Sequence, residues 1–266
     1  MSAADSAYAS HIAQWLDAEP ELRLARLFVA QARDPRVEAI EAIAHALHAS
    51  LFGLQEAQLV QAKLAWWLDE LAQQTPRHPL TRQLHALDDG AAAAAPLREV
   101  AASVWRLAQR GSIESFEHLL EPLSAAAEGV VRARHAVGVE DAAIGPAPLA
   151  VAAARLLAAA RDWPRFARPE RALLPLQLLA AQRIDRAGGA DGVGAISAAR
   201  AVFAAMQDVF DTAAGTALRG IDGARVAAAM IWARRLLATP QAAVEGRIGA
   251  PRVSLVLGLW RVGRRS

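Results

Sequence analysis

The chain has 266 residues, of which 54% are hydrophobic and 21% are charged, a composition that supports a sizeable core and is untypical of disordered chains. Its 29 basic and 27 acidic residues leave a net charge of +2, which gives no general field for binding nucleic acid. The absence of cysteine excludes disulfides, thiolate metal sites and cysteine nucleophiles. Alanine, leucine and arginine outnumber β-branched and aromatic residues, so we predict an all-α protein.

Neither a signal peptide nor a membrane span is expected. The first residues carry an early acid and lack the apolar centre of a signal peptide. The longest apolar run lies near 147–160, is interrupted by Arg155, and is shorter than the ~20 residues that cross a bilayer. We therefore expect a cytoplasmic protein.

Three helices are predicted at the start of the chain, over Ser6–Asp17, Glu21–Ala32 and Pro35–Leu51. The third has strong end signals, because Asp34 is a good N-cap and is followed directly by a proline at the first helical position. Gly53 is placed to end it.

On the third of these helices, Glu41, His45 and His48 follow one another at i, i+4 and i+7 and share one face. Carboxylate and imidazole groups at this spacing suit a metal ion. A helical metal site usually recruits a further ligand from another element, and the sequence identifies none. A partly exposed polar face is the other interpretation, and we assign no metal ligand.

The most distinctive stretch is Glu56–Leu84, which holds the adjacent Trp66 and Trp67 and the only lysine of the chain, Lys63. Its apolar residues recur at helical spacing. Lys63, Trp67 and Glu70 fall on one stripe of this helix, where an ammonium group can lie on an indole face. Two interpretations remain open: the tryptophans pack in the core, or the stripe lines a pocket. We expect Lys63 to be partly buried, with its ammonium directed towards Glu70 or a cavity.

This stretch resembles a motif of the squalene/phytoene synthase family. The motif here reads Lys63-x-x-Trp66-Trp67, followed about ten residues later by His78-Pro79. It is most similar to the divergent bacterial branch that has arginine in place of the lysine. The segment from Pro20 to Leu47 resembles the opening helices of the same family.

The middle of the chain is predicted to be one domain with the rest, spanning residues 1–266. Asp88-Asp89-Gly90 is interpreted as a helix end and turn, because no third carboxylate follows one turn later. A helix is expected from an N-cap at Ser112 to about Val137. Val137–Pro148 is punctuated by glycine and proline and is predicted to be a loop or linker. It could separate two domains, but the helices on either side are too apolar to be stable alone, so one domain is preferred.

The most apolar helix is expected over Leu149–Trp163, at the centre of the fold and facing the helix of the tryptophan pair. Its end reads Ala-Arg-Asp-Trp-Pro at 160–164 and resembles the second acidic region of the family, where a helix closes with Leu-Arg-Asp. Arg161 and Asp162 match that pattern. Phe166 stands where the family has its second aspartate.

A third match and the last helices complete the chain. Glu170–Leu179 resembles the family's Arg-x-x-Leu-Pro segment and the leucines after it. Helices are then expected over Ala195–Gly215, Asp222–Ala238 and Pro251–Gly263. The last one is apolar, contains Trp260 and ends among arginines, so it is either a packing helix or a contact with a membrane surface.

The resemblance implies a single-domain helical isoprenoid/terpenoid synthase-like fold with a central apolar cavity. Family members condense two prenyl diphosphates head to head in isoprenoid biosynthesis, with Mg²⁺ held by carboxylates on two facing helices. On that basis Lys63, Trp67, Arg161 and Asp162 are expected to bind substrate.

The carboxylates for such a clamp are mostly absent, because one helix offers only Glu38 and Glu41 and the other only Asp162. Two functions therefore remain open. The chain is either a prenyltransferase of the squalene/phytoene synthase type, with Mg²⁺ as its cofactor, or a non-catalytic protein that uses the fold to bind lipid or to assemble with a protein partner. Both predict an isoprenoid or other lipid-like ligand. The C-terminal helix would allow peripheral contact with the inner membrane.

Overall fold

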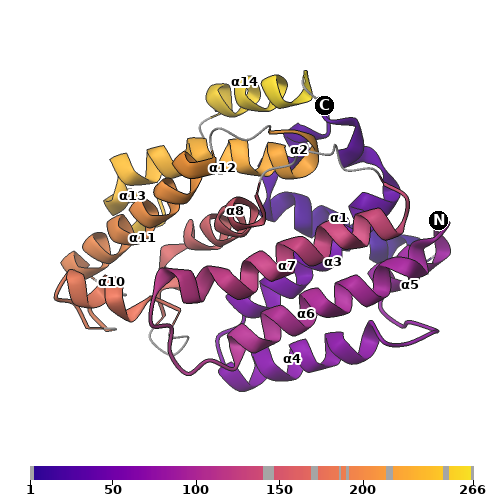
Figure 1. Ribbon diagram of the computed structural model, residues 1–266, viewed down its shortest axis with the longest axis horizontal. Helices are drawn as coiled ribbons and strands as arrows, with labels where there is room; N and C mark the ends of the chain where they lie inside the picture. The colour runs from indigo at the N-terminus through magenta and orange to yellow at the C-terminus, as the bar shows by residue number, and fades with distance from the viewer. Residues whose placement is uncertain are drawn as a thin grey trace.

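Every regular element of the chain is a helix in the computed structural model, which describes residues 3–139, 147–168, 173–185, 187–189, 192–213, 218–247 and 252–264 (Figure 1). No strand occurs within these ranges, which confirms the prediction of an all-α protein. In chain order the elements, with η marking a 3₁₀ turn, are α1 (Ala3–Ala18), α2 (Pro20–Ala25), η1 (Ala30–Arg33), α3 (Pro35–Gly53), α4 (Ala57–Glu70), α5 (Pro79–Ala86), η2 (Gly90–Ala93), α6 (Ala94–Ala108), α7 (Phe116–Ala136), α8 (Pro148–Ala160), α9 (Trp163–Phe166), α10 (Leu176–Ala181), α11 (Gly192–Ala213), α12 (Gly220–Ala238), α13 (Pro240–Val244) and α14 (Arg252–Gly263).

Capping side chains fix the starts of α3, α5 and α7. Asp34 caps α3, its Oδ1 accepting from the backbone N–H of Arg36 at 2.8 Å. His78 caps α5 in the same way through Nδ1, which accepts from the N–H of Leu80 at 3.2 Å. The cap of α7 is Ser115 and not the predicted Ser112, because the hydroxyl of Ser115 is the one that accepts from the first turn of the helix.

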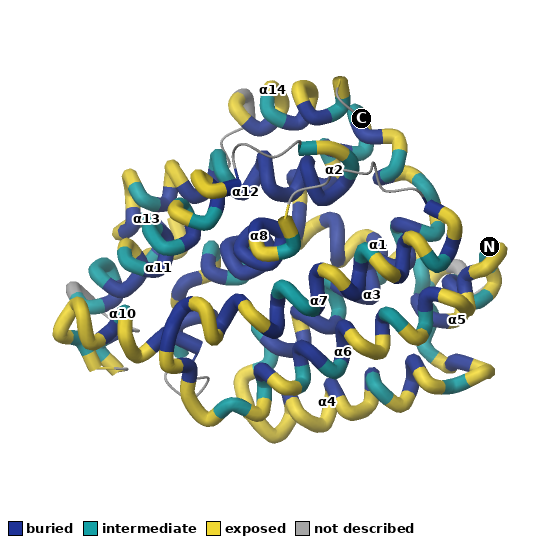
Figure 2. The backbone as a smooth tube through the Cα atoms, viewed as in Figure 1, coloured by how far each residue is buried: buried dark blue, intermediate teal, exposed yellow. Residues whose placement is uncertain are grey.

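The helices pack as one unit in which α8 has a central place. α4 packs on α6, α6 on α7, and α7 on α8, while the other sides of α8 contact α11 and α12 (Figure 1). Most of α8 is buried, as Figure 2 shows, and this follows from its run of alanine, leucine and valine. Contacts of α12 with α2 and η1 join the end of the chain to its beginning.

The helix of the tryptophan pair does not face α8 as predicted. α4 buries Val60, Leu64, Trp67 and Glu70 along one stripe and lays them against α6 and α3. In Figure 1, α6 and α7 lie between α4 and α8. The surface of α8 is already covered by α7, α11 and α12.

The C-terminal helix α14 packs on α12 and α2 through its buried face. Across the described part of the chain, no helix combines the length and apolar character needed to span a bilayer. Parts of several predicted segments lie outside the described residues: 140–146 of the loop Val137–Pro148, 170–172 of the stretch Glu170–Leu179, 214–215 of the helix Ala195–Gly215, residue 251 of the helix Pro251–Gly263, and the C-terminal arginine at 265.

Candidate functional site

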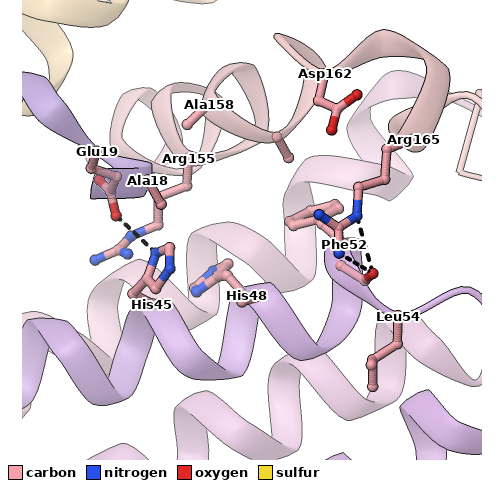
Figure 3. A pocket seen from close by; sticks show the side chains of 13 residues that line it. Ala18, Glu19, His45, His48, Phe52, Leu54, Arg155, Ala158, Asp162 and Arg165 are labelled. Carbon is pink, nitrogen blue, oxygen red and sulfur yellow. Dashed lines mark hydrogen bonds and ion pairs between the residues drawn. The ribbon is translucent and has the colours of Figure 1, made fainter. Parts of the chain in front are cut away.

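A pocket of about 450 Å³ lies between α3 and α8 and is closed at one end by the α1–α2 junction; we call it the α3–α8 pocket. Figure 3 shows His45 and His48 projecting from α3 towards α8, and Arg155 reaching from α8 towards them. Its walls are largely apolar and include Ala49 and Phe52 of α3. A pocket of this size and lining suits a small, mostly apolar ligand with a few polar groups.

Glu41 of α3 lies at the centre of a set of buried charges next to this pocket. Its Oε1 accepts from Arg134 of α7 at 2.6 Å. Its Oε2 accepts from Arg155 of α8 and from Arg225 of α12, both at 2.8 Å. Glu41 is fully buried, so a carboxylate here is stable only with such partners.

Two further carboxylates complete the set. Asp222 of α12 pairs with Arg134 and with Arg225, the latter at 3.1 Å. Glu19 pairs with Arg225 at 3.1 Å and with Nδ1 of His45 at 3.3 Å. We call this set the charged network; it consists of Glu19, Glu41, Arg134, Arg155, Asp222 and Arg225. Three positive and three negative groups therefore balance inside the bundle.

The electrostatics of the network keep Glu19 and Glu41 ionised. Burial alone would raise the pKa of Glu41, but the guanidinium groups of Arg225, Arg155 and Arg134 outweigh burial and lower that pKa to about 2. Burial opposes ionisation of Glu19 too, and Arg225 again reverses the effect, so its pKa lies well below the usual range. Both carboxylates are charged at neutral pH.

His48 is neutral and presents an unused acceptor. Its Nδ1 lies 2.7 Å from the carbonyl oxygen of Ala44, which can only accept, so Nδ1 carries the proton. Burial, followed by the nearby charge of Arg155, lowers the pKa of His48 to about 3. Its Nε2 is buried and has no hydrogen-bond partner within the described residues, and the same holds for Nε of Arg155.

Of the predicted site residues, Asp162 lines the α3–α8 pocket, at the exposed turn between α8 and α9. Arg161 points elsewhere: it pairs with Glu21 at 3.0 Å, and its guanidinium lies 4.9 Å from the ring centre of Trp232. These two neighbours in sequence therefore have different surroundings. Arg161 links the end of α8 to α2 through its ion pair with Glu21, whereas Asp162 lines the pocket.

Lys63 and Trp67 line a second pocket, of about 290 Å³, which shares His45, Ala49 and Leu54 with the first. The structure therefore brings Lys63, Trp67 and Asp162 to two adjoining pockets along α3. Arg161 does not line either of them.

The environment of Lys63 agrees with the prediction in one respect, because the residue lines a pocket, and differs from it in burial and in the predicted contact with Glu70. The residue is exposed, and its ammonium lies 4.3 Å from the ring centre of Trp66 and 5.8 Å from that of Trp67. It does not turn to Glu70, whose Oε1 instead accepts from the backbone N–H groups of Arg77 and His78 at 2.8 and 2.7 Å. Glu70 is buried, and its hydrogen bonds with the backbone fix the conformation of the α4–α5 connection.

The histidine face of α3 is not the partly exposed surface that was one prediction. Glu41 and His48 are buried, and His45 is half-buried. The three do not converge, because Glu41 bonds to arginines, His45 to Glu19 and His48 to a backbone carbonyl. Across the described residues, no group of three histidine, cysteine or acidic side chains is arranged to hold a metal ion.

The charged network was missed by the sequence analysis, although one signal for it was present. Arg155 interrupts a helix that is otherwise entirely apolar, and an arginine that must be buried needs a buried acid. Its partner Glu41 is 114 residues away in sequence, so a sequence pattern does not pair the two residues.

A scan of the chain against models of protein families gives no match, and a search of curated proteins gives no match either. The likeness to the squalene/phytoene synthases remains a prediction from three short motifs.

Proposed function

We propose that this chain is a squalene/phytoene synthase-like helical protein that binds an isoprenoid or other lipid-like chain in the α3–α8 pocket without catalysing prenyl transfer. The observation that carries the proposal is that both carboxylate oxygens of Glu41 already accept hydrogen bonds from arginines. The buried acid of α3 is bonded to arginines from three other helices, so it is not available to a metal–diphosphate complex. The pocket beside it keeps apolar walls.

The other acids that a clamp would need are also placed unfavourably. Glu38, one turn before Glu41, pairs with Arg26 at 2.5 Å. Asp162 has no second acid beside it on α9, because Phe166, one turn later, is buried and apolar. The other carboxylate in the pocket lining, Glu19, is already paired with Arg225 and His45. Mg²⁺ prefers six oxygen ligands and is held by carboxylates together with phosphate, so one free carboxylate supports it weakly.

Calorimetry with a non-hydrolysable farnesyl diphosphate analogue, with and without Mg²⁺, tests this proposal. We expect binding that does not depend on Mg²⁺ and is unchanged in Asp162→Ala. The matched control is Asp208→Ala, which removes an exposed acid on α11. Tight binding that needs Mg²⁺, is lost in Asp162→Ala and persists in Asp208→Ala would contradict the proposal and support a prenyltransferase.

We also propose that α14 places the protein at an anionic membrane surface. Leu255, Leu259 and Val262 pack inwards, whereas Val256, Leu257 and Trp260 are exposed on the outer side of the same helix. Arg261 and Arg264 are exposed beside them, and the guanidinium of Arg264 lies 5.0 Å from the ring centre of Trp260. Apolar and aromatic residues flanked by arginines fit the headgroup region of a bilayer.

Flotation with vesicles tests this second proposal. Vesicles that contain phosphatidylglycerol should carry the protein, while vesicles of phosphatidylcholine alone should carry much less. Leu257→Glu should abolish flotation, and Leu176→Glu, at another exposed leucine, should not. Equal flotation with both vesicle types, or no effect of Leu257→Glu, would contradict it.

A further inference from the structure

The second pocket, of about 290 Å³, has a lining that contains bases but no acid; we call it the Lys63 pocket. Its basic side chains come from separate parts of the chain and are His11 of α1, His45 of α3, Lys63 of α4 and His78, the N-cap of α5. Among the described residues that line it, there is no aspartate or glutamate. A concave site lined in this way attracts an anion and repels a metal ion.

Lys63 supplies the fixed positive charge of this pocket. Its ammonium has no ion pair and no hydrogen bond with the described residues, and it lies 4.3 Å from the ring centre of Trp66 and 5.8 Å from that of Trp67. His78 shares these two neighbours, since its ring centre is 5.7 Å from that of Trp66 and 4.8 Å from that of Trp67. An ammonium group with three donors and no acid beside it is a suitable partner for an oxyanion.

The ring of His78 adds a free donor. Its Nδ1 accepts from the backbone N–H of Leu80, so the neutral ring carries its proton on Nε2. This Nε2 has no hydrogen-bond partner within the described residues and, unlike Nε2 of His48, it is not closed off from solvent. The ring of His11 lies beside it, with 4.6 Å between the ring centres, and is also without a hydrogen-bond partner there. The pocket lining therefore combines an ammonium group with two accessible imidazoles.

The carboxylates that contact this lining are already engaged. Glu19 pairs with Nδ1 of His45 at 3.3 Å, and Glu70 accepts from the backbone N–H of His78 at 2.7 Å. Neither carboxylate lines the Lys63 pocket itself. The charge of Lys63 is therefore left without a counterion from the described part of the protein.

The pKa values of the two imidazoles reflect the same excess of positive charge. Burial first, and then the charges of His11 and Lys63, lower the pKa of His78 to about 4 against the opposite effect of Glu70. Burial and the charge of Lys63 also lower the pKa of His11. Arg77, next to His78 in the chain, is exposed and bears a further positive charge. A bound anion would oppose these charges and raise both pKa values, so its affinity must increase as pH falls.

We propose that the Lys63 pocket binds a small oxyanion, a phosphate, sulfate or carboxylate group, whose charge is balanced by Lys63 and which lies beside the imidazoles of His11 and His78. This inference goes beyond the proposed function, because it assigns an anion site outside the α3–α8 pocket. The oxyanion is either a free ion or the head of a ligand whose chain lies in the adjoining α3–α8 pocket. Both sources share this chemistry, and titration with matched ligands separates them.

Sulfate is the first probe, because its charge does not change with pH over the titrated range. Sulfate added at constant ionic strength should shift the NMR signals of the His11 and His78 rings in a saturable way. The ring of His118, exposed on α7, is the internal control and should not respond. Binding should be tighter at pH 5.5 than at pH 7.5, in line with the raised pKa values of the bound state.

Substitutions at Lys63 test the source of the attraction. Lys63→Gln removes the charge and should weaken sulfate binding about fivefold or more, whereas Lys63→Arg keeps the charge and should retain most of the affinity. The matched control is Arg234→Gln, which removes a charge at an exposed position on α12 and should have no effect. Because Lys63 is exposed, these variants should fold, and circular dichroism checks this before titration.

Farnesyl phosphate and farnesol distinguish the two sources of the oxyanion. If it is a ligand head, farnesyl phosphate should bind about tenfold more tightly than farnesol, and Lys63→Gln should remove that difference. If it is a free ion, sulfate should bind and the two farnesyl compounds should bind alike. Equal sulfate binding in the wild type and Lys63→Gln, or unresponsive His11 and His78 rings, would overturn this inference. Sulfate binding without binding of either farnesyl compound would instead overturn the proposed lipid-binding function and leave the anion site in place.

Discussion

The charged network and the tryptophan corner, which we define as Lys63, Trp66, Trp67 and His78, both combine charged groups with apolar helices, but they differ in contact with water. In the network, Glu41 and Arg134 are almost completely buried and their ion pair joins α3 to α7. In the corner, Lys63 is exposed and lies over the indoles from outside. The corner has the recognisable sequence motif, whereas the network links four helices and the α1–α2 junction.

A recognisable sequence motif and a large contribution to stability are therefore separate properties of a segment. A charge in water gains little from a partner, because solvent and salt screen the attraction. A charge removed from water depends on its partners, so removing one leaves the others uncompensated. Substitutions should therefore be costly in the network and mild in the corner.

The largest effect is expected for Glu41→Ala. The change leaves three buried guanidinium groups without their central acid and should lower the free energy of unfolding by about 3–5 kcal/mol. Urea unfolding followed by circular dichroism measures it. Glu99→Ala, which breaks an exposed ion pair with Arg132, is the control and should cost less than about 1 kcal/mol. If Glu41→Ala and Glu99→Ala lower the free energy of unfolding by similar amounts, the buried network is no more important for stability than an exposed ion pair.

A smaller loss is expected for Glu70→Ala, at the edge of the tryptophan corner. The change leaves the partly buried N–H groups of Arg77 and His78 without their acceptor and also removes the buried bond from Thr81, so it should cost about 2 kcal/mol. Asp69→Ala, at the exposed neighbouring position, should be nearly silent in the same unfolding experiment. If Glu70→Ala is equally silent, the α4–α5 connection does not depend on this carboxylate.

His48 gives the interior a distinct response to pH. Its pKa is about 3 in the folded chain, against about 6.5 when unfolded, so below pH 6.5 the unfolded state takes up a proton that the folded state does not. Stability must then decrease as pH falls, and at pH 5 the loss from this residue is about 2 kcal/mol. Glu41 adds nothing at that pH, because its lowered pKa affects stability only below about pH 4.5.

The measurement is the change in unfolding free energy between pH 7.5 and pH 5 in the wild type and in His48→Leu. The wild type should lose about 2 kcal/mol more than the variant. His45, Glu19 and Arg155 surround the ring in both proteins, so the difference between the two isolates His48. Equal losses would show that His48 titrates normally and takes a proton in the folded state.

The smallest effect is expected for Lys63→Ala. An exposed ammonium over an indole contributes about 0.5 kcal/mol, and solvent screens it. The free energy of unfolding at 50 mM and 500 mM salt measures this directly, with a slightly smaller effect at high salt. A loss of 2 kcal/mol or more would contradict the expectation that the tryptophan corner contributes much less to the free energy of unfolding than the network.

The helices and their main ends could be predicted from the sequence because their signals are local. Asp34 and Pro35 specify the start of α3, and Pro79 specifies that of α5. The partners of buried charges could not be predicted, since Glu41, Arg134 and Arg225 meet only through the packing of α3, α7 and α12. For the same reason the sequence did not show that Arg161 pairs with Glu21, which lies 140 residues away in the chain.

The central claim, that arginines occupy the acid on α3 where a metal clamp would need it and leave a lipid pocket beside it, is tested most directly by a crystal structure. The crystals should be grown with the farnesyl diphosphate analogue and Mg²⁺. We expect the isoprenoid chain to lie between α3 and α8, Glu41 to remain bonded to Arg134, Arg155 and Arg225, and no metal ion to bind Asp162. Mg²⁺ bridging the diphosphate to Asp162 and Glu41, with those arginine bonds broken, would contradict it.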